Sequence, residues 1–549
     1  MVVNAIHLQG GFAVPTHSPS PSPSPSPSAD RRVMAVLAAG GIVTTLVQTA
    51  VVPLLPQLPR LTGAAPVDVG WVVTLTLLTG AVATPLLGRA GDMYGKRRML
   101  LVALGALAVG SLVCSLASTL PRLLVGRGLQ GVGAAVVPLS ISFLRGVLPP
   151  HRTGSSVALM SSTVGIGAAL GLPLAALLVQ FADWHAMFWA MTVLSAAVLV
   201  PAWWVLREEP VRSPGRFDLV GACGLSAGLV LLLLALSKAG EWGWGSRRVL
   251  GMSGAALLIL AGWTVQQRRV SRPLVDVRLA TRPAVLLPHV AALSAGFAFY
   301  ANSLVTAQLI QAPRVTGYGL GLSVAAAGAC LLPSGVIMVL CASLSARLSA
   351  ARGAEATLTL GTMVMAVGYG LRFADSRQLW AVIAGAAVVS VGTALAYSAL
   401  PMLIMRAVPL EQTAAANGLN VLMRTIGQAL CSAVVATVLA AHTRVFAGVS
   451  GVAVAAPTLD GYRVAFAAAG AVALLACAAA RLIPHRPRPA PSPLQEAEHD
   501  ARTELRLPPP RPSANDDQEP AGTGTGTGPG TGTGTADARP GTGPGGTTA

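Results

Sequence analysis

An arginine stands inside a long apolar stretch, where a full charge is costly. Arg127 opens the segment Arg127–Ala135, which reads RGLQGVGAA. A guanidinium within the hydrocarbon of a membrane requires a partner or a water-filled cavity. We therefore interpret Arg127 as functional; the alternative is a residue that snorkels to the membrane surface.

A second charged feature is a short turn that combines glycines, one carboxylate and a basic cluster. The segment Gly88–Arg98 reads GRAGDMYGKRR. Glycine allows close backbone approach and positive φ. Asp92 could face a helix N-terminus or pair with a nearby cation, whereas a loop that only sets membrane topology is the alternative. The residues that we single out are Gly88, Asp92, Gly95, Lys96 and Arg97.

Small residues mark a third segment, Gly165–Ala176, which reads GIGAALGLPLAA. Gly167 and Gly171 are four residues apart, so they share one helix face and permit close packing. Pro173 removes a backbone hydrogen bond and can kink the helix.

The composition indicates what must position these residues. Of the 549 residues, 53% are hydrophobic and only 11% are charged, and the mean hydropathy is +0.64. Because a soluble domain carries about 25% charged residues, lipid must cover much of this surface. The net charge of +17 is carried by short basic clusters between apolar runs, which favours loops near an anionic membrane surface over nucleic-acid binding.

Six cysteines fall in apolar runs without a CxxC pair. This pattern is typical of small buried residues, so we expect no metal and no cofactor.

Apolar stretches long enough to cross a membrane recur along the chain. We expect about fourteen spans, in an all-α polytopic membrane protein. Their approximate bounds are 34–56, 70–88, 98–118, 122–144, 154–180, 185–206, 217–238, 249–267, 285–311, 321–345, 356–373, 378–404, 413–440 and 461–483. Residues 1–32, with their Ser-Pro repeats, and residues 485–549, rich in Pro, Gly and Thr, are predicted to be disordered tails.

Basic residues predict the orientation. With the N-terminus in the cytoplasm, inside loops hold about 17 Lys and Arg, among them Arg269, Arg282 and Arg352, against about 10 outside. The outside group includes Lys238, Arg372 and Arg444. Both termini are therefore predicted to be cytoplasmic.

These motifs together resemble the major facilitator superfamily. Gly88–Arg98 is similar to its G-x-x-x-D-x-x-G-[RK]-[RK] signature. Arg127, Gln130 and Gly131 match its R-x-x-Q-G-x-G-x-A motif. In that family the arginine is linked to proton coupling and to the loop aspartate, which is Asp92 here.

Further similarities point to the fourteen-helix branch of drug:proton antiporters. Gly167, Gly171 and Pro173 resemble its antiporter motif, although Leu172 stands in the place of the proline. The segment Asn417–Gly427, with Arg424 inside the membrane, also resembles this branch. The resemblance implies two pseudo-symmetric six-helix halves, residues 33–206 and 284–484, around an inserted helix pair in residues 207–283.

One departure concerns the proton. Many members of this branch carry an aspartate in the first helix, where this chain has Val47. Coupling needs a group whose protonation changes during the cycle. His289 and Asp92 are the candidates that we put forward, and His289 has the more suitable intrinsic pKa. Asp218 and Glu411 remain as further possibilities.

A substrate cavity is expected between the halves, near the midplane. Its candidate polar and aromatic lining residues are Gln48, Phe297, Tyr300, Asn302 and Gln308. A cavity with few acidic residues favours neutral, zwitterionic or anionic substrates over cations.

The sequence thus predicts a plasma-membrane transporter, monomeric, that exports drugs or antibiotics by proton antiport. A facilitator or uptake permease without antiport is the alternative, and a non-transporting receptor is another. No GxxxxGK[ST] or HExxH motif occurs, so neither ATP-driven transport nor an enzyme is expected.

Overall fold

A computed structural model describes residues 27–51, 54–55, 57–181, 183–208, 217–271, 273–447 and 453–484. The chain divides into two units, residues 1–485 and 486–549. All described residues belong to the first unit. The predicted tail 485–549 and residues 1–26 lie outside them.

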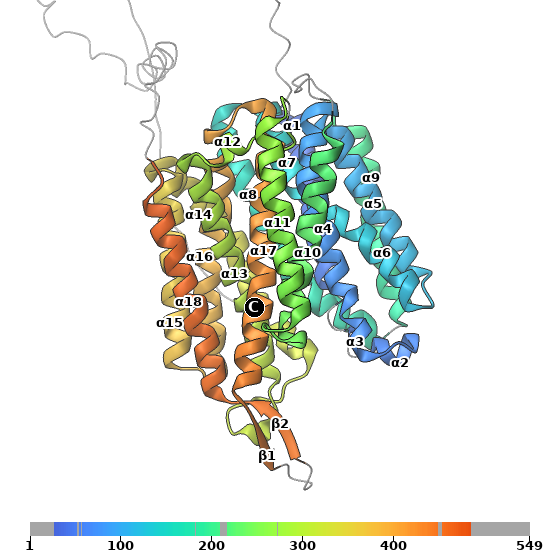
Figure 1. Ribbon diagram of the computed structural model, residues 1–549, viewed down its shortest axis with the longest axis vertical. Coiled ribbons are helices and arrows are strands. Elements are labelled where there is room, and N and C mark those ends of the chain that lie inside the picture. Colours follow the sequence, from blue (N-terminus) through green and yellow to red (C-terminus); the bar gives the residue numbers. More distant parts are fainter. Residues whose placement is uncertain are drawn as a thin grey trace, which may run out of the picture. The chain divides into compact units, whose positions relative to one another are not determined.

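Long helices dominate the first unit (Figure 1). They are α1 (Pro27–Thr49), α4 (Trp71–Tyr94), α5 (Lys96–Ser115), α6 (Leu120–Val132), α7 (Val136–Val147), α8 (Pro150–Phe181), α9 (Trp184–Val205), α10 (Leu219–Trp242), α11 (Arg247–Arg269), α13 (Pro283–Gln311), α14 (Val324–Arg352), α15 (Ala354–Ala374), α16 (Leu379–Ala407), α17 (Thr413–Ala441) and α18 (Leu459–Arg481). The 3-10 turn η2 (Gly133–Ala135) joins α6 to α7. Shorter elements are α2 (Leu58–Thr62), α3 (Pro66–Val69), α12 (Val277–Ala280), η3 (Arg314–Thr316) and η4 (Leu410–Gln412).

Every predicted span overlaps one of these long helices. Within the described residues, 11 helices are long and apolar enough to cross a membrane, or up to 12 if the bent helix α14 counts as one span. A helix satisfies its own backbone hydrogen bonds, which is what a lipid environment requires. The fold is therefore that of a multi-pass helical membrane protein.

Two boundaries of the prediction are wrong. Helix α1 begins at Pro27, inside the segment predicted to be a disordered tail, and ends at Thr49 instead of near residue 56. Proline is favourable at the start of a helix, and a polar first turn extends beyond the apolar run that the prediction detected.

The all-α prediction also missed a small sheet. Strands β1 (Thr443–Ala447) and β2 (Ala453–Pro457) pair antiparallel, with Thr443 opposite Pro457 and Ala447 opposite Ala453. This hairpin connects α17 to α18 and extends past the helix ends (Figure 1). The adjacent Val445 and Phe446 of β1 favour a strand, but so short a run was taken for a loop.

The long helices pack as two groups that contact each other, with a further helix pair against both. One buried apolar cluster comes almost entirely from α1–α9, which we call the N-terminal group. A second comes almost entirely from α13–α18, the C-terminal group. Helices α10 and α11 pack together, and α10 contacts both α4 and α17. Figure 1 shows this green pair where the blue N-terminal helices meet the orange α17.

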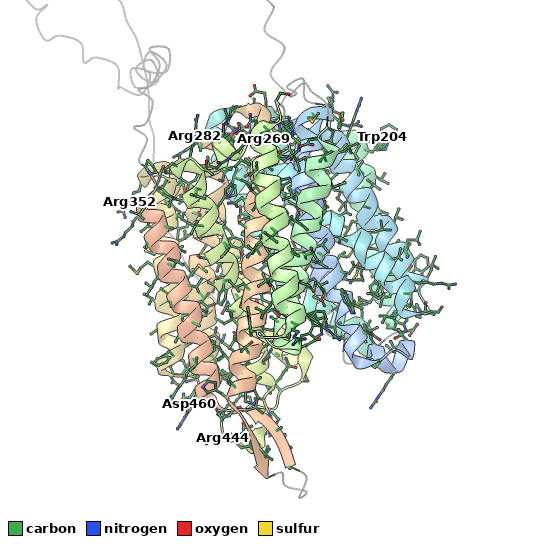
Figure 2. All side chains as sticks on the ribbon, viewed as in Figure 1. Trp204, Arg269, Arg282, Arg352, Arg444 and Asp460 are labelled. Carbon is green, nitrogen blue, oxygen red and sulfur yellow. The ribbon has the colours of Figure 1, made fainter. Side chains whose placement is uncertain are left out.

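Exposed arginines lie at both ends of the bundle. Arg269, Arg282 and Arg352 lie at one end, and Arg444 lies beside the hairpin at the other (Figure 2). This partition agrees with the predicted inside and outside loops. We call the two ends the Arg269 end and the hairpin end.

Two cations were wrongly assigned to outside loops. Lys238 lies within α10 and is 3% exposed, while Arg372 lies within α15 and is fully buried. The Nζ of Lys238 is 2.9 Å from an Oε of Glu241 and 5.6 Å from the ring centroid of Trp71. Because internal partners hold both cations, the helices continue past the charge that was taken as a boundary.

Candidate functional site

Asp92 joins the N-terminal group to the first turn of α17. Its side chain, 1% exposed in the last turn of α4, accepts hydrogen bonds from the backbone N–H groups of Ala414 (3.2 Å) and Ala415 (2.9 Å). These N–H groups have no partner inside their own helix, and the helix dipole favours a negative charge there. The carboxylate of Asp92 therefore lies at a helix N-terminus, one of its two predicted arrangements.

Glycines bring the same two helices close together. A Cβ on Gly88 would lie 2.6 Å from the carbonyl oxygen of Ala414. One on Gly418 would lie 2.8 Å from the carbonyl oxygen of Thr84. Neither position has room for a side chain, so the contact of α4 with α17 depends on both glycines.

Helix α7 completes this contact. Arg145 donates to the hydroxyl of Thr413 at 2.6 Å and to the carbonyl of Val408 at 3.3 Å. The Nδ2 of Asn417 donates to the hydroxyl of Ser142 at 3.3 Å. We call the set Asp92, Gly88, Gly418, Arg145 and Thr413 the Asp92 interface. It closes the Arg269 end between the two groups.

The rest of the predicted loop motif faces α9 instead. Arg97 donates from Nε to the carbonyl of Leu206 (2.6 Å) and from Nη2 to that of Trp203 (2.8 Å). Gly95 has φ of 112°, which favours glycine, and Lys96 is buried in the first turn of α5. Arg97 thus holds the start of α5 against the end of α9, and Gly95 allows the turn between Asp92 and α5.

Arg127 is enclosed at the junction of α1, α4 and α6. It is 1% exposed and donates to the carbonyls of Val47 (3.2 Å) and Val72 (3.3 Å) and to Oε1 of Gln130 (2.7 Å). Gln130 in turn donates to the hydroxyl of Ser111 at 2.9 Å. None of these partners is Asp92, so no direct contact provides the link between Arg127 and Asp92 that the resemblance implies. Gly131 lets α6 approach α4 beside Thr76 and Thr79.

Helix α8 packs closely on α1 through the predicted glycines. A Cβ on Gly167 would lie 2.5 Å from the carbonyl oxygen of Ile42, and one on Gly171 would lie 3.0 Å from that of Leu46. Helix α8 runs through Pro173, whose side chain lies outside the described residues.

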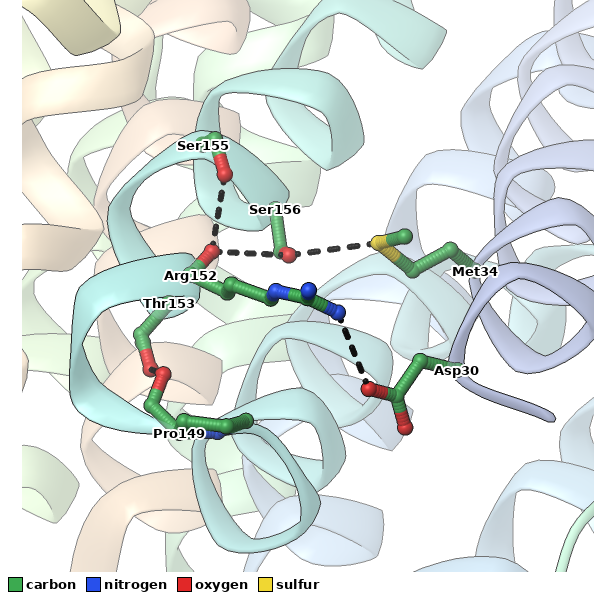
Figure 3. Close-up of polar contacts among 7 residues, drawn as sticks. All are labelled: Asp30, Met34, Pro149, Arg152, Thr153, Ser155 and Ser156. Carbon is green, nitrogen blue, oxygen red and sulfur yellow. Dashed lines mark hydrogen bonds and ion pairs between the residues drawn. The ribbon is translucent and has the colours of Figure 1, made fainter. Parts of the chain in front are cut away.

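The same helix pair is tied at the Arg269 end. Arg152 of α8 pairs with Asp30 of α1 at 3.3 Å, and the hydroxyl of Ser156 lies 3.4 Å from the sulfur of Met34 (Figure 3). Asp30 belongs to the segment that was predicted to be disordered.

A central cavity of about 220 Å³ lies between the two groups. Of the residues put forward for a substrate cavity, Tyr300 and Asn302 line this one, and Gln48, Phe297 and Gln308 do not. Phe297 is buried in the C-terminal group, and Gln308 is exposed on α13. The sequence reasoning did not identify the other lining residues: Thr49, Gly165, Ala168, Phe299, Ser303, Leu304, Ala307, Gln311, Gly328, Leu331, Ser334, Gly335, Met338 and Ser390.

His289 lies away from this cavity. It lines a second cavity of about 240 Å³ together with Arg89, Asp276 and Gln412. The imidazole is 5% exposed, and neither ring nitrogen has a hydrogen-bond partner among the described residues.

Two further buried arginines occupy the C-terminal group. Arg424, 9% exposed, places its guanidinium carbon 4.5 Å from the ring centroid of Tyr397. Arg372, which the prediction missed as a site residue, donates to Oδ1 of Asn302 (2.9 Å) and to the hydroxyl of Thr306 (2.6 Å). Among the described residues, no cluster of His, Cys, Asp and Glu is placed to hold a metal ion.

Comparison with known proteins relates this geometry to a family. The model of the Major Facilitator Superfamily matches residues 37–432 and 290–515. The tetracenomycin C resistance and export protein of Streptomyces glaucescens is 29% identical over 417 residues, covering 74% of this chain and 75% of that protein. The cephamycin export protein of Amycolatopsis lactamdurans is 30% identical over 399 residues, covering 71% and 81%.

Two solved transporter structures share the fold of this chain. The human organic anion transporter MFSD10 superposes with a TM-score of 0.60 at 18% identity, covering 82% of this chain and 99% of that one. The proton:xylose symporter XylE superposes with a TM-score of 0.59 at 14% identity, covering 83% and 96%. The chain therefore belongs to the major facilitator superfamily and is a multi-pass membrane transporter of small molecules, not an enzyme.

Proposed function

We propose that the protein exports drugs or antibiotics across the plasma membrane by alternating access, in exchange for protons. The observation that carries this proposal is the central cavity between two helical groups that the Asp92 interface joins at one end. The names of the relatives as resistance and export proteins support the direction of transport.

The proposed architecture has fourteen spans. Helices α8 and α15 would supply two beyond the up to 12 recognised by length and apolarity. Residues 33–206 and 284–484 would form the two pseudo-symmetric halves, and residues 207–283 the inserted pair. The Arg269 end would be cytoplasmic, with both termini, and the protein would act as a monomer.

Protonation of Asp92 offers a way to couple protons to opening. The carboxylate is held by two N–H groups at the positive end of a helix dipole, an interaction that weakens when the charge is lost. A proton on Asp92 would therefore loosen the Asp92 interface and release α17 from α4. His289 is the second candidate, because it is a buried imidazole beside the same end of α17 and has no hydrogen-bond partner in the described part of the chain.

A facilitator or uptake permease without antiport is the alternative. The observation that favours it lies at Val47, where Arg127 contacts a backbone carbonyl instead of the acid that many relatives carry. A carbonyl cannot take up a proton in this cycle.

Transport measurements in inverted membrane vesicles distinguish the proton antiporter from the facilitator. The vesicles are energised with a proton gradient, a panel of antibiotics and dyes is added, and the internal pH is followed. Compounds that dissipate the gradient in wild-type vesicles, but not in Arg127→Ala vesicles, support antiport. Labelled compounds that equilibrate without moving protons support the facilitator, and no movement of any compound contradicts both.

A further inference from the structure

The cations within the helical bundle differ in their partners. The buried Lys238 and the partly exposed Arg152 each contact a carboxylate, Glu241 and Asp30 respectively. In the described part of the chain, Arg127, Arg372 and Arg424 contact no carboxylate at all. Their partners are carbonyls, amide and hydroxyl oxygens, and aromatic rings. Such dipoles stabilise a guanidinium but leave its net charge in place, and arginine does not deprotonate in proteins.

Arg372 reaches the central cavity through Asn302. The guanidinium donates to Oδ1 of Asn302, which fixes the orientation of the amide. Its Nδ2 then points to the carbonyl of Ala386 at 3.2 Å and to the hydroxyl of Ser390 at 3.4 Å. Asn302 and Ser390 both line the cavity. Ser390 in turn donates to the carbonyl of Ala386 at 2.9 Å, so the buried cation orients a polar network in the cavity wall.

Arg424 reaches the cavity through two aromatic rings. Its guanidinium lies over Tyr397, whose ring centroid is 5.4 Å from that of Phe299, and Phe299 lines the cavity. Arg127 approaches from the opposite group. It donates to the carbonyl of Val47, two residues from the lining residue Thr49.

No acidic residue is among those that line the cavity in the described chain. A cation there would meet three permanent positive charges without a counter-charge, whereas an anion would be attracted by all three. The effect is strong because the walls are largely apolar and screen little. Aromatic side chains at Phe299 and Tyr300 add flat apolar surface for a ring system.

We propose that the substrates are organic anions with an aromatic or fused-ring body, and that the substrate itself supplies the counter-charge to Arg372, Arg424 and Arg127. This inference rests on the proposed export function and specifies its substrate class. It also accounts for Val47, since an acid beside Arg127 would cancel part of the attraction.

The substrate charge has a consequence for the driving force. Export of a monoanion from a cell with a negative interior moves charge down the membrane potential, which shifts its equilibrium distribution by about 50-fold per 100 mV. A membrane potential can therefore drive export of an anion even with few protons exchanged.

The test uses inverted vesicles that contain the full chain and two dyes with the same xanthene ring system. Fluorescein is an anion at neutral pH, and pyronin is a cation. Uptake of each dye is measured with and without a lumen-positive potential set by potassium and valinomycin. We expect saturable fluorescein uptake that the potential accelerates, and little uptake of pyronin.

Variants assign the selectivity to the arginines. Arg372→Gln and Arg424→Gln should each lower fluorescein uptake about tenfold or more, because each removes a desolvated charge partner. They should also lower the ratio of fluorescein to pyronin uptake. Arg424→Lys, which keeps the charge, should retain much of that ratio.

Lys238→Gln is the matched control, because it removes a buried but paired cation outside the cavity and should leave the ratio unchanged. Fluorescein binding to purified protein, followed by anisotropy, separates lost recognition from poor folding.

Uptake of pyronin or of neutral antibiotics without uptake of fluorescein overturns the anion inference and leaves the export function standing. An unchanged dye ratio in both Gln variants, with folded protein, also overturns it. If no compound moves, the export function fails and this inference fails with it.

Discussion

The two helical groups meet in different ways at the Arg269 end and around the central cavity. At the Arg269 end, the carboxylate of Asp92 caps α17, Arg145 has an oxygen acceptor at 2.6 Å, and glycines remove the space between helices. Around the cavity, buried cations contact only neutral groups, and space remains between the groups. A closed contact is stabilised by satisfied charges, whereas a binding cavity keeps charges that a ligand can satisfy.

This contrast suggests a division of labour. The Asp92 interface would set which end of the transporter is open, and the arginines around the cavity would set what is carried. Changes at the interface should alter transport of every substrate alike. Changes at the cavity should alter selectivity between substrates.

The largest effect is expected from Arg127→Ala, which should abolish transport while expression stays near normal. The change removes a buried charge from α6, and with it the hydrogen bonds that Arg127 donates to the carbonyls of Val47 and Val72 and to Oε1 of Gln130. The measurement is substrate flux in vesicles, normalised to the amount of protein in the membrane. Wild-type flux in this variant would refute the role that we assign to Arg127.

Asp92→Asn is expected to abolish transport of all substrates alike. The amide keeps the shape of the side chain but carries no charge to favour the N-terminus of α17. Flux of an anionic and of a neutral compound should fall together, and the closed contact of α4 with α17 should open more often. Labelling of a cysteine placed at Ala415 measures that opening. A selective loss of one substrate, with labelling unchanged, would place Asp92 outside the interface function.

A smaller but still clear effect is expected from Gly418→Val. The added side chain has no room against the carbonyl of Thr84, and such overpacking costs about 1–3 kcal/mol. We expect flux to fall about tenfold, as these energies imply, with an unfolding temperature a few degrees lower. Gly105→Val is the matched control, because no atom lies within 4 Å of a Cβ at Gly105. Equal losses in both variants would show that helix propensity, not the interface, is responsible.

The sequence predicted the helices well because an apolar run of membrane length has few other interpretations. It also predicted that Asp92 could face a helix N-terminus, but not that this helix is α17, more than 300 residues away along the chain. Arg372 was missed because a charge at the end of an apolar run resembles a loop residue. Its partners Asn302 and Thr306 become neighbours only in the folded protein.

The lining residues of the cavity were harder to predict for a related reason. Phe297, Tyr300 and Asn302 all lie on α13, but only the latter two face the cavity. Which side of an almost uniformly apolar helix faces the cavity depends on the helices packed against it, and the sequence of α13 alone does not record them.

The smallest expected effects compare the two regions through a single hydroxyl. Thr413→Ala removes an acceptor that lies 2.6 Å from Nη1 of Arg145, while Ser390→Ala removes one that lies 3.4 Å from Nδ2 of Asn302. A hydrogen bond to a charged group contributes about 1.5–3 kcal/mol and a neutral one about 0.5–1.5. Arg145 keeps the carbonyl of Val408, so we expect Thr413→Ala to lower flux of all substrates about threefold. The long bond to Ser390 predicts a change of about twofold or less, confined to substrates that accept a hydrogen bond.

Measuring the flux of an anionic and of a neutral compound in each variant tests these two expectations. A general loss in Ser390→Ala, or a selective loss in Thr413→Ala, would break the distinction between an interface that opens the transporter and a cavity that selects its substrate.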